Sequence, residues 1–121
     1  MYIIRKNNYN FSEEQLFVVG KRDNNKKRSF LFISKLLGKH LAVKPEVVKA
    51  TGYLLSSLKY NFNNDSFVDC IKNNCKPDYR NHAKDNDVLV VGFCETATAL
   101  GISVASSIEG STFIATTREP I

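Results

Sequence analysis

The sequence of 121 residues predicts an α/β domain in which helices flank a parallel sheet. Three short apolar runs predict strands, namely "FLFIS" (30–34), "VLVV" (88–91) and "TFIATT" (112–117). Helical periodicity fills the stretches between them, and strands that alternate with helices are typical of a parallel sheet. The length fits a single domain over residues 1–121, which we expect to be incomplete at its C-terminus because the predicted sheet is small.

The first predicted element is a short helix from Glu13 to Lys21. Ser12 and Gln15 have the spacing of a capping box, in which each side chain accepts or donates at the helix start. Phe11 and Leu16 occupy the two positions of a hydrophobic staple. The polar loop "KRDNNKK" then ends this helix.

The middle of the chain predicts one strand and two helices. "FLFIS" has the aromatic and β-branched content of a strand buried on both faces, and Pro45 is suited to the first position of the next helix. A second, shorter helix follows in "SFVDCIKNN", and "CKPDYRNHAKDND" is a polar connector. Apolar side chains at helical spacing predict that one stripe of the longer helix is buried: Val47, Val48, Thr51, Leu54, Leu55 and Leu58.

The last third predicts a strand, a tight turn, a helix and a final strand. "VLVV" is the second buried strand, and helical periodicity begins at Thr96. Gly110 is the expected C-cap of that helix.

Composition and charge exclude several classes. No apolar run is long enough for a membrane span, and three cysteines without a recognisable secretory signal favour the reducing cytoplasm. The net charge of +5 divides into +7 for residues 1–49 (11 Lys and Arg, 4 Asp and Glu) and −2 for residues 50–121 (6 and 8). The basic part is either a solvated surface or a surface for phosphates. Nucleic acid is disfavoured because the basic stretch lacks interleaved aromatic residues and any helix-turn-helix or RRM signature.

The stretch "VLVVGFCETATALG" (88–101) is the most informative. A helix that starts at the end of a strand presents unpaired N–H groups and a dipole that favours an anion, so a phosphate suits Thr96–Ala99. The alternative is that Thr96 caps the helix and the alanines pack. The turn lacks the endings of a P-loop and the GxGxxG pattern of dinucleotide-binding folds. Cys94 as a nucleophile and a zinc site at Cys70 and Cys75 are both disfavoured by the spacing of their neighbours.

Two blocks, "KKRSFLFISKLLGKHLAVKP" and "VLVVGFCETATALGISVASSI", are followed by "FIATTREP". In this order they resemble a phosphoribosyltransferase-like family found in bacterial gene clusters with tellurium-resistance proteins. The resemblance implies the type I phosphoribosyltransferase fold, a Rossmann-like parallel sheet with flanking helices. It also implies phosphoribosyl pyrophosphate as the ligand, or another phosphorylated small molecule, together with Mg2+. It leaves a homodimer open.

The resemblance places two ends of the ligand. Thr96, Ala97, Thr98 and Ala99 would hold the 5-phosphate through backbone N–H groups, with Glu95 near the ribose hydroxyls. The pyrophosphate would be bound by Ser34, Lys35 and Lys39, and the other residues expected at the rim are His40, Arg118 and Glu119.

The resemblance also has one departure. Phosphoribosyltransferases end this strand with two adjacent acidic residues that hold the ribose, whereas here the positions are Gly92 and Phe93. The implied reaction displaces pyrophosphate from the anomeric carbon by a nitrogen nucleophile, through an oxocarbenium-like transition state. The departure keeps a second hypothesis open, a non-catalytic module of the same fold that binds a phosphorylated ligand.

Overall fold

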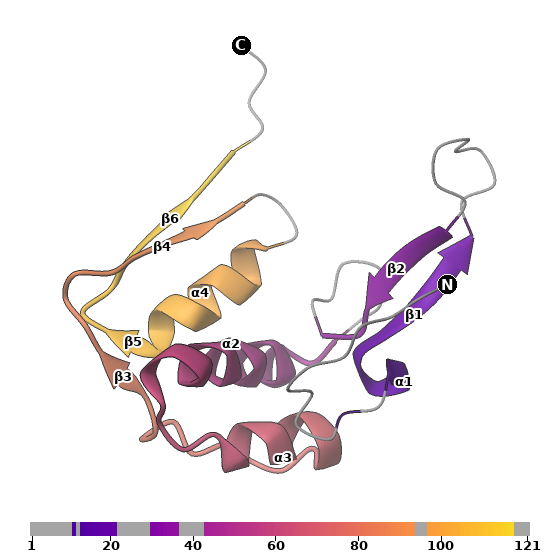
Figure 1. Ribbon diagram of the computed structural model, residues 1–121, viewed down its shortest axis with the longest axis horizontal. Coiled ribbons are helices and arrows are strands. Elements are labelled where there is room, and N and C mark those ends of the chain that lie inside the picture. Colours follow the sequence, from indigo (N-terminus) through magenta and orange to yellow (C-terminus); the bar gives the residue numbers. More distant parts are fainter. Residues whose placement is uncertain (1–10, 12, 22–29, 37–42, 94–96, 118–121) are drawn as a thin grey trace.

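Figure 1 shows the computed structural model of the chain, which describes residues 11, 13–21, 30–36, 43–93 and 97–117. For residues 13–14, 17–21 and 30–34 the backbone alone is described. The described elements are helices and small two-stranded sheets, so the chain is an α/β protein. No helix in these ranges has the length and apolar character needed to cross a membrane.

The N-terminal part forms a hairpin. Helix α1 (Glu13–Leu16) is a single turn, and it leads directly into β1 (Phe17–Lys21), which pairs antiparallel with β2 (Phe30–Ser34). The prediction of a helix from Glu13 to Lys21 is therefore wrong beyond Leu16. The sequence "FVVGK" is rich in β-branched and aromatic residues, which favour a strand. A helix this short is only marginally stable by itself, whereas pairing with β2 supplies backbone hydrogen bonds along the whole strand.

Two helices follow, as predicted. Helix α2 (Pro45–Tyr60) starts with Pro45 as expected and ends at Asn61, whose left-handed backbone (φ 58°) lets its N–H donate to the Ser57 carbonyl at 2.9 Å. Helix α3 (Asp65–Asn73) ends in the same way at Asn74, with φ 56°. In both cases asparagine occupies the position that glycine most often takes at a helix end.

The core lies between α2 and α3. Tyr53 and Phe67 stack with ring centroids 5.0 Å apart, and Phe67 is fully buried. The predicted stripe on α2 is only partly correct, because Leu55 and Leu58 are 44% and 54% exposed. The buried residues of the core cluster are Phe11, Ala50, Tyr53, Leu54, Phe67 and Cys70.

Small residues bring α2 against α4 (Thr98–Ser106). A Cβ atom on Gly52 would lie 2.4 Å from the Ser103 Cβ and 2.7 Å from the Ser103 carbonyl carbon, so only glycine fits there. Ser56 and Ser107 are buried in the same contact and hydrogen-bond to each other. The Tyr53 hydroxyl donates to the Ser106 carbonyl at 3.2 Å. Helix α4 is therefore fixed closely to the helical core.

The other side of α4 packs on a parallel pair, β4 (Leu89–Gly92) and β6 (Thr112–Ala115). A second parallel pair joins β3 (Ala83–Lys84) to β5 (Ile108–Glu109). Parallel pairing of the last two predicted strands is thus confirmed. Gly110 is not a helix C-cap, because α4 ends at Ser106; with φ 91° it lies in the turn between β5 and β6, where a Cβ would lie 2.0 Å from Asn86 Oδ1.

The expected single sheet is divided into three two-stranded sheets in the described part of the chain. Strand β2 was expected in the parallel sheet, but it pairs antiparallel with β1, its neighbour in the sequence. The prediction that "VLVV" is buried on both faces is also wrong, since Leu89 and Val91 are 55% and 45% exposed. Helix α4 covers only one face of the β4–β6 pair (Figure 1).

Candidate functional site

The candidate site is the turn that joins β4 to α4. Strand β4 ends at the buried Gly92, and the Phe93 carbonyl accepts a hydrogen bond from the Ala97 N–H at 3.2 Å. The Gly101 N–H then donates to the Ala97 carbonyl at 2.8 Å, one helical turn further along the chain. Residues 98–100 begin the first turn of α4.

Two glycines and one ring set the distance between strand and helix. A Cβ on Gly101 would lie 2.8 Å from the Phe113 ring and 3.3 Å from the Gly92 Cα. A Cβ on Gly92 would lie 3.1 Å from the same ring and 3.3 Å from the Ala97 carbonyl oxygen. The absence of both side chains lets the helix start close to the strand end. No local sequence pattern predicts this role of Phe113, although Gly92 and Gly101 stand nine residues apart in the sequence.

The electrostatics of this helix start favour an anion. Ala97 makes no side-chain capping bond, and α4 carries no acidic residue in its first turn and no basic residue in its last. The positive end of the helix dipole is therefore not compensated by a charge of the helix itself. Ala99 is exposed, while Ala97 and Thr98 are half-buried. Such an arrangement binds phosphates and carboxylates in many proteins.

The structure brings three of the predicted phosphate-binding residues, Ala97, Thr98 and Ala99, to this helix start. Glu95 and Thr96 lie outside the described residues. Their predicted contacts with ribose and phosphate stay predictions.

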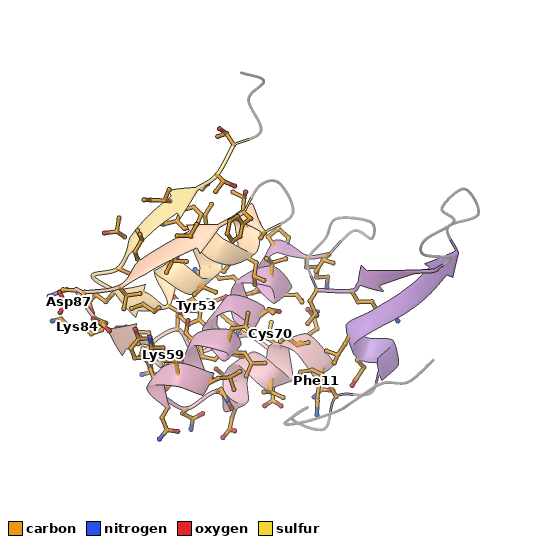
Figure 2. The ribbon with its side chains drawn as sticks, turned by 45° about the horizontal axis from the view of Figure 1, so that its top comes forward. Phe11, Tyr53, Lys59, Cys70, Lys84 and Asp87 are labelled. Carbon is orange, nitrogen blue, oxygen red and sulfur yellow. The ribbon has the colours of Figure 1, made fainter. Side chains whose placement is uncertain are left out.

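The predicted pyrophosphate end lies on a different element. Ser34 ends β2, and the Lys35 N–H donates to the Leu16 carbonyl at 2.8 Å. This bond extends the pairing of the two strands at the end of the hairpin away from its loop. The hairpin lies at one end of the molecule and the β4–β6 pair at the other in both views (Figures 1 and 2). The described residues therefore do not place β2 beside β4, as one parallel sheet would. Lys39, His40, Arg118 and Glu119 lie outside the described ranges.

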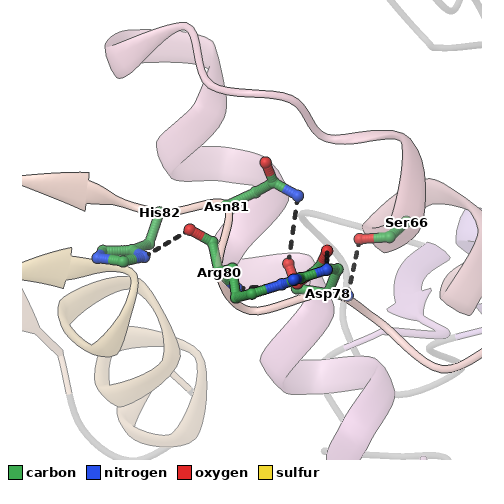
Figure 3. A network of polar contacts seen from close by, with 5 residues as sticks. All are labelled: Ser66, Asp78, Arg80, Asn81 and His82. Carbon is green, nitrogen blue, oxygen red and sulfur yellow. Dashed lines mark hydrogen bonds and ion pairs between the residues drawn. The ribbon is translucent and has the colours of Figure 1, made fainter.

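A separate polar network fixes the connector between α3 and β3 (Figure 3). The Asp78 N–H donates to Ser66 Oγ at 2.9 Å, and the Arg80 guanidinium donates to both Asp78 carboxylate oxygens at 2.9 and 2.8 Å. The hydrogen bonds from Arg80 lower the pKa of Asp78 to about 2. His82 contacts the Arg80 carbonyl at 2.9 Å and the Glu109 carboxylate at 3.3 Å. These groups lie away from the α4 turn and hold the connector in place.

Two cysteines with free thiols lie in the described ranges, Cys70 and Cys75. Burial between α2 and α3 raises the pKa of Cys70, as expected for an inert core cysteine, and Cys75 is exposed. Within the described residues, no group of three or more His, Cys, Asp or Glu side chains is placed to hold a metal ion.

Comparison with known proteins identifies the family of this chain. A family model described as "Phosphoribosyl transferase" matches residues 16–121. No curated protein and no solved structure matches the chain. The matched range includes the hairpin, the helical core and the whole β4–α4–β6 unit with its anion-favouring turn. This chain therefore belongs to the phosphoribosyl transferase family.

Proposed function

We propose that the chain binds phosphoribosyl pyrophosphate and transfers its phosphoribosyl group to a nitrogen nucleophile with release of pyrophosphate. The observation that carries the proposal is the uncapped start of α4 at the end of a parallel strand, inside the range that matches the family. Ligands of open α/β sheets bind at the carboxyl ends of the strands, which is where this turn lies.

The 5-phosphate is assigned to the helix start. Backbone N–H groups of residues 98–100 and the Thr98 hydroxyl supply the donors, and Ala97 and Ala99 leave room for the phosphate oxygens. Glu95 and Thr96 complete the turn in this proposal, with Glu95 near the ribose.

The pyrophosphate is assigned to Ser34, Lys35 and Lys39, with His40, Arg118 and Glu119 at the rim. Of the basic residues assigned here to the ligand, Lys35 is the one that lies within the described ranges. Its side chain is half-buried at the end of the hairpin. Its role would be to stabilise the charge that develops on the leaving pyrophosphate. The chain's contribution to the reaction is then mostly the positioning of the two ends of the ligand.

Mg2+ is implied by the resemblance. The described residues do not fit a metal site built by the protein alone, because they include no suitable cluster of ligands. Mg2+ commonly reaches such sites bound to the phosphates of the ligand, with few protein contacts.

The second candidate is a module that binds a phosphorylated ligand without a reaction. Gly92 and Phe93 favour it, since they stand where the acidic pair of active relatives is expected and Phe93 is 70% exposed. A place beside bacterial tellurium-resistance proteins, also implied by the resemblance, is compatible with either function.

Calorimetric titration with phosphoribosyl pyrophosphate, with and without Mg2+, tests the binding. Ala99→Glu places a carboxylate at the start of α4, where the helix dipole stabilises it, so the variant should fold and lose at least about tenfold in affinity. The matched control is Ser106→Glu, at the exposed far end of the same helix. Equal affinity of the two variants would contradict the assignment of the phosphate to the helix start.

The reaction needs its own assay. Release of pyrophosphate from phosphoribosyl pyrophosphate, in the presence of pools of nitrogen compounds, distinguishes the enzyme from the binding module. Binding without release in any pool favours the module, and absence of binding by the wild type rejects both candidates.

A further inference from the structure

The ring of Phe113 lies between the end of β4 and the first turn of α4. Phe113 belongs to β6, where it pairs with Val90 of β4. A Cβ atom on Gly101 would lie 2.8 Å from Cε2 of this ring and 3.4 Å from its Cζ. A Cβ atom on Gly92 would lie 3.1 and 3.2 Å from the same two ring atoms. One edge of a single ring therefore faces both the strand end and the helix.

The strand end and the far end of α4 are each fixed by other contacts. The Gly92 carbonyl accepts a hydrogen bond from the Thr116 N–H at 3.0 Å, so the end of β4 is fixed to the chain that continues β6 (Figure 1). The far end of α4 is fixed to α2, because the Tyr53 hydroxyl donates to the Ser106 carbonyl at 3.2 Å. Between these two points, the Phe113 ring is the side chain nearest to both backbones. Its size therefore sets how closely the first turn of α4 approaches the strand.

Phe113 is not part of the main core of the chain. Its side chain is half-buried, and the core cluster between α2 and α3 does not include it. An apolar contact that opens by about 0.5–1 Å loses roughly a quarter to a half of its dispersion energy. A shorter side chain at this position would therefore let the helix start move toward the strand, while the core between α2 and α3 stays unchanged.

We propose that Phe113 is a positioning residue for the ligand at the start of α4. Its ring holds the first turn at the distance from β4 at which the turn binds the phosphate, and it acts through the backbone of the helix without touching the ligand. This inference rests on the proposed function, which assigns the 5-phosphate to that turn. It adds a residue of β6, remote in sequence from the turn, to those that determine the affinity for the ligand.

Calorimetric titration of the full chain with phosphoribosyl pyrophosphate and Mg2+ tests the inference on two single variants and their combination. Phe113→Leu removes the edge of the ring, and Gly101→Ala adds a methyl group to the same space from the helix side. Each change alone should lower the affinity about tenfold, because a displacement of about 1 Å at a preorganised site can cost about 100-fold. The double variant should recover most of this loss, since the new methyl group occupies space that the ring leaves.

The matched control is Phe62→Leu, the same change at a half-buried ring that packs edge-to-face on Phe67 at 6.3 Å. It should lower the unfolding temperature and leave the affinity unchanged, and circular dichroism establishes that each variant is folded during the titration.

Equal affinity of Phe113→Leu and Phe62→Leu overturns the inference and leaves the proposed function in place. Losses that simply add in the double variant also overturn it, because the ring and the helix then do not share one spacing. A wild-type chain that does not bind the ligand rejects the proposed function itself, and the inference with it.

Discussion

The helical half and the sheet half of this molecule differ in how completely their apolar side chains are buried. In the helical half, α2 and α3 enclose an aromatic cluster in which Phe67 is completely buried, and Tyr79 closes the cluster against Tyr53 with centroids 4.9 Å apart. In the sheet half, β4 and β6 carry α4 on one face and leave four large apolar side chains exposed on the other. The difference indicates that the stability of the chain comes mainly from the helices, while the proposed ligand site lies in the sheet half.

The largest expected effect comes from truncating the core. Phe67→Ala should cost about 3–5 kcal/mol of unfolding free energy, because it removes a fully buried ring. Ile114→Ala on β6 should cost less than about 1 kcal/mol, because half of that side chain is already exposed. Urea unfolding of the two variants compares these costs. Similar costs would show that the two halves are equally well packed.

The next largest expected effect concerns the two glycine contacts of α4, one with α2 and one with the β4–β6 pair. Gly52→Ala should cost about 1–3 kcal/mol, since its new methyl group meets the backbone and the Cβ of Ser103, which cannot move alone. Gly101→Ala meets the Phe113 ring at 2.8 Å and the Gly92 Cα at 3.3 Å, so its closest contact is a side chain and not backbone. Alanine restores roughly 1 kcal/mol of helix propensity at either position, so Gly101→Ala should cost less than Gly52→Ala. Thermal unfolding of both variants measures the difference, and a larger loss for Gly101→Ala would reverse the ranking of the two contacts.

The smallest effect is a pH dependence in the connector that links the halves. Since the fold lowers the pKa of Asp78 to about 2, from its ordinary value of 3.8, its carboxylate contributes stability above about pH 4. That contribution is lost as the pH falls from about 4 to 2. Asp78→Asn should therefore flatten the acid limb of the stability curve in this window. An unchanged slope would show that the Arg80 contact does not persist in solution.

The sequence predicted those elements whose signals are local. Pro45 marked the start of α2, and the apolar runs near residues 88 and 112 gave both strands of the parallel pair. The helix expected at Glu13–Lys21 failed after one turn because its capping signal is local, whereas the strand pairing of Phe17–Lys21 depends on residues up to 17 positions away.

Burial was harder to predict than secondary structure. Periodicity identified apolar positions such as Leu55 and Leu58 on α2, but it does not tell which of them a neighbouring element covers. For the candidate site, Ala97, Thr98 and Ala99 followed from the strand–turn–helix pattern. The position of Lys35 relative to that turn depends on how the hairpin packs, and no local pattern contains this information.

Helix α4 has one more consequence, since it belongs to both halves. Ser103 and Ser107 hold it against α2, and Gly101 holds it against β4. A ligand bound at its first turn therefore adds its binding free energy to the folding of the whole chain by mass action, and not to the sheet half alone. The two halves should then unfold in a single cooperative transition whose midpoint rises with ligand concentration, even though most of the buried aromatic surface lies in α2 and α3.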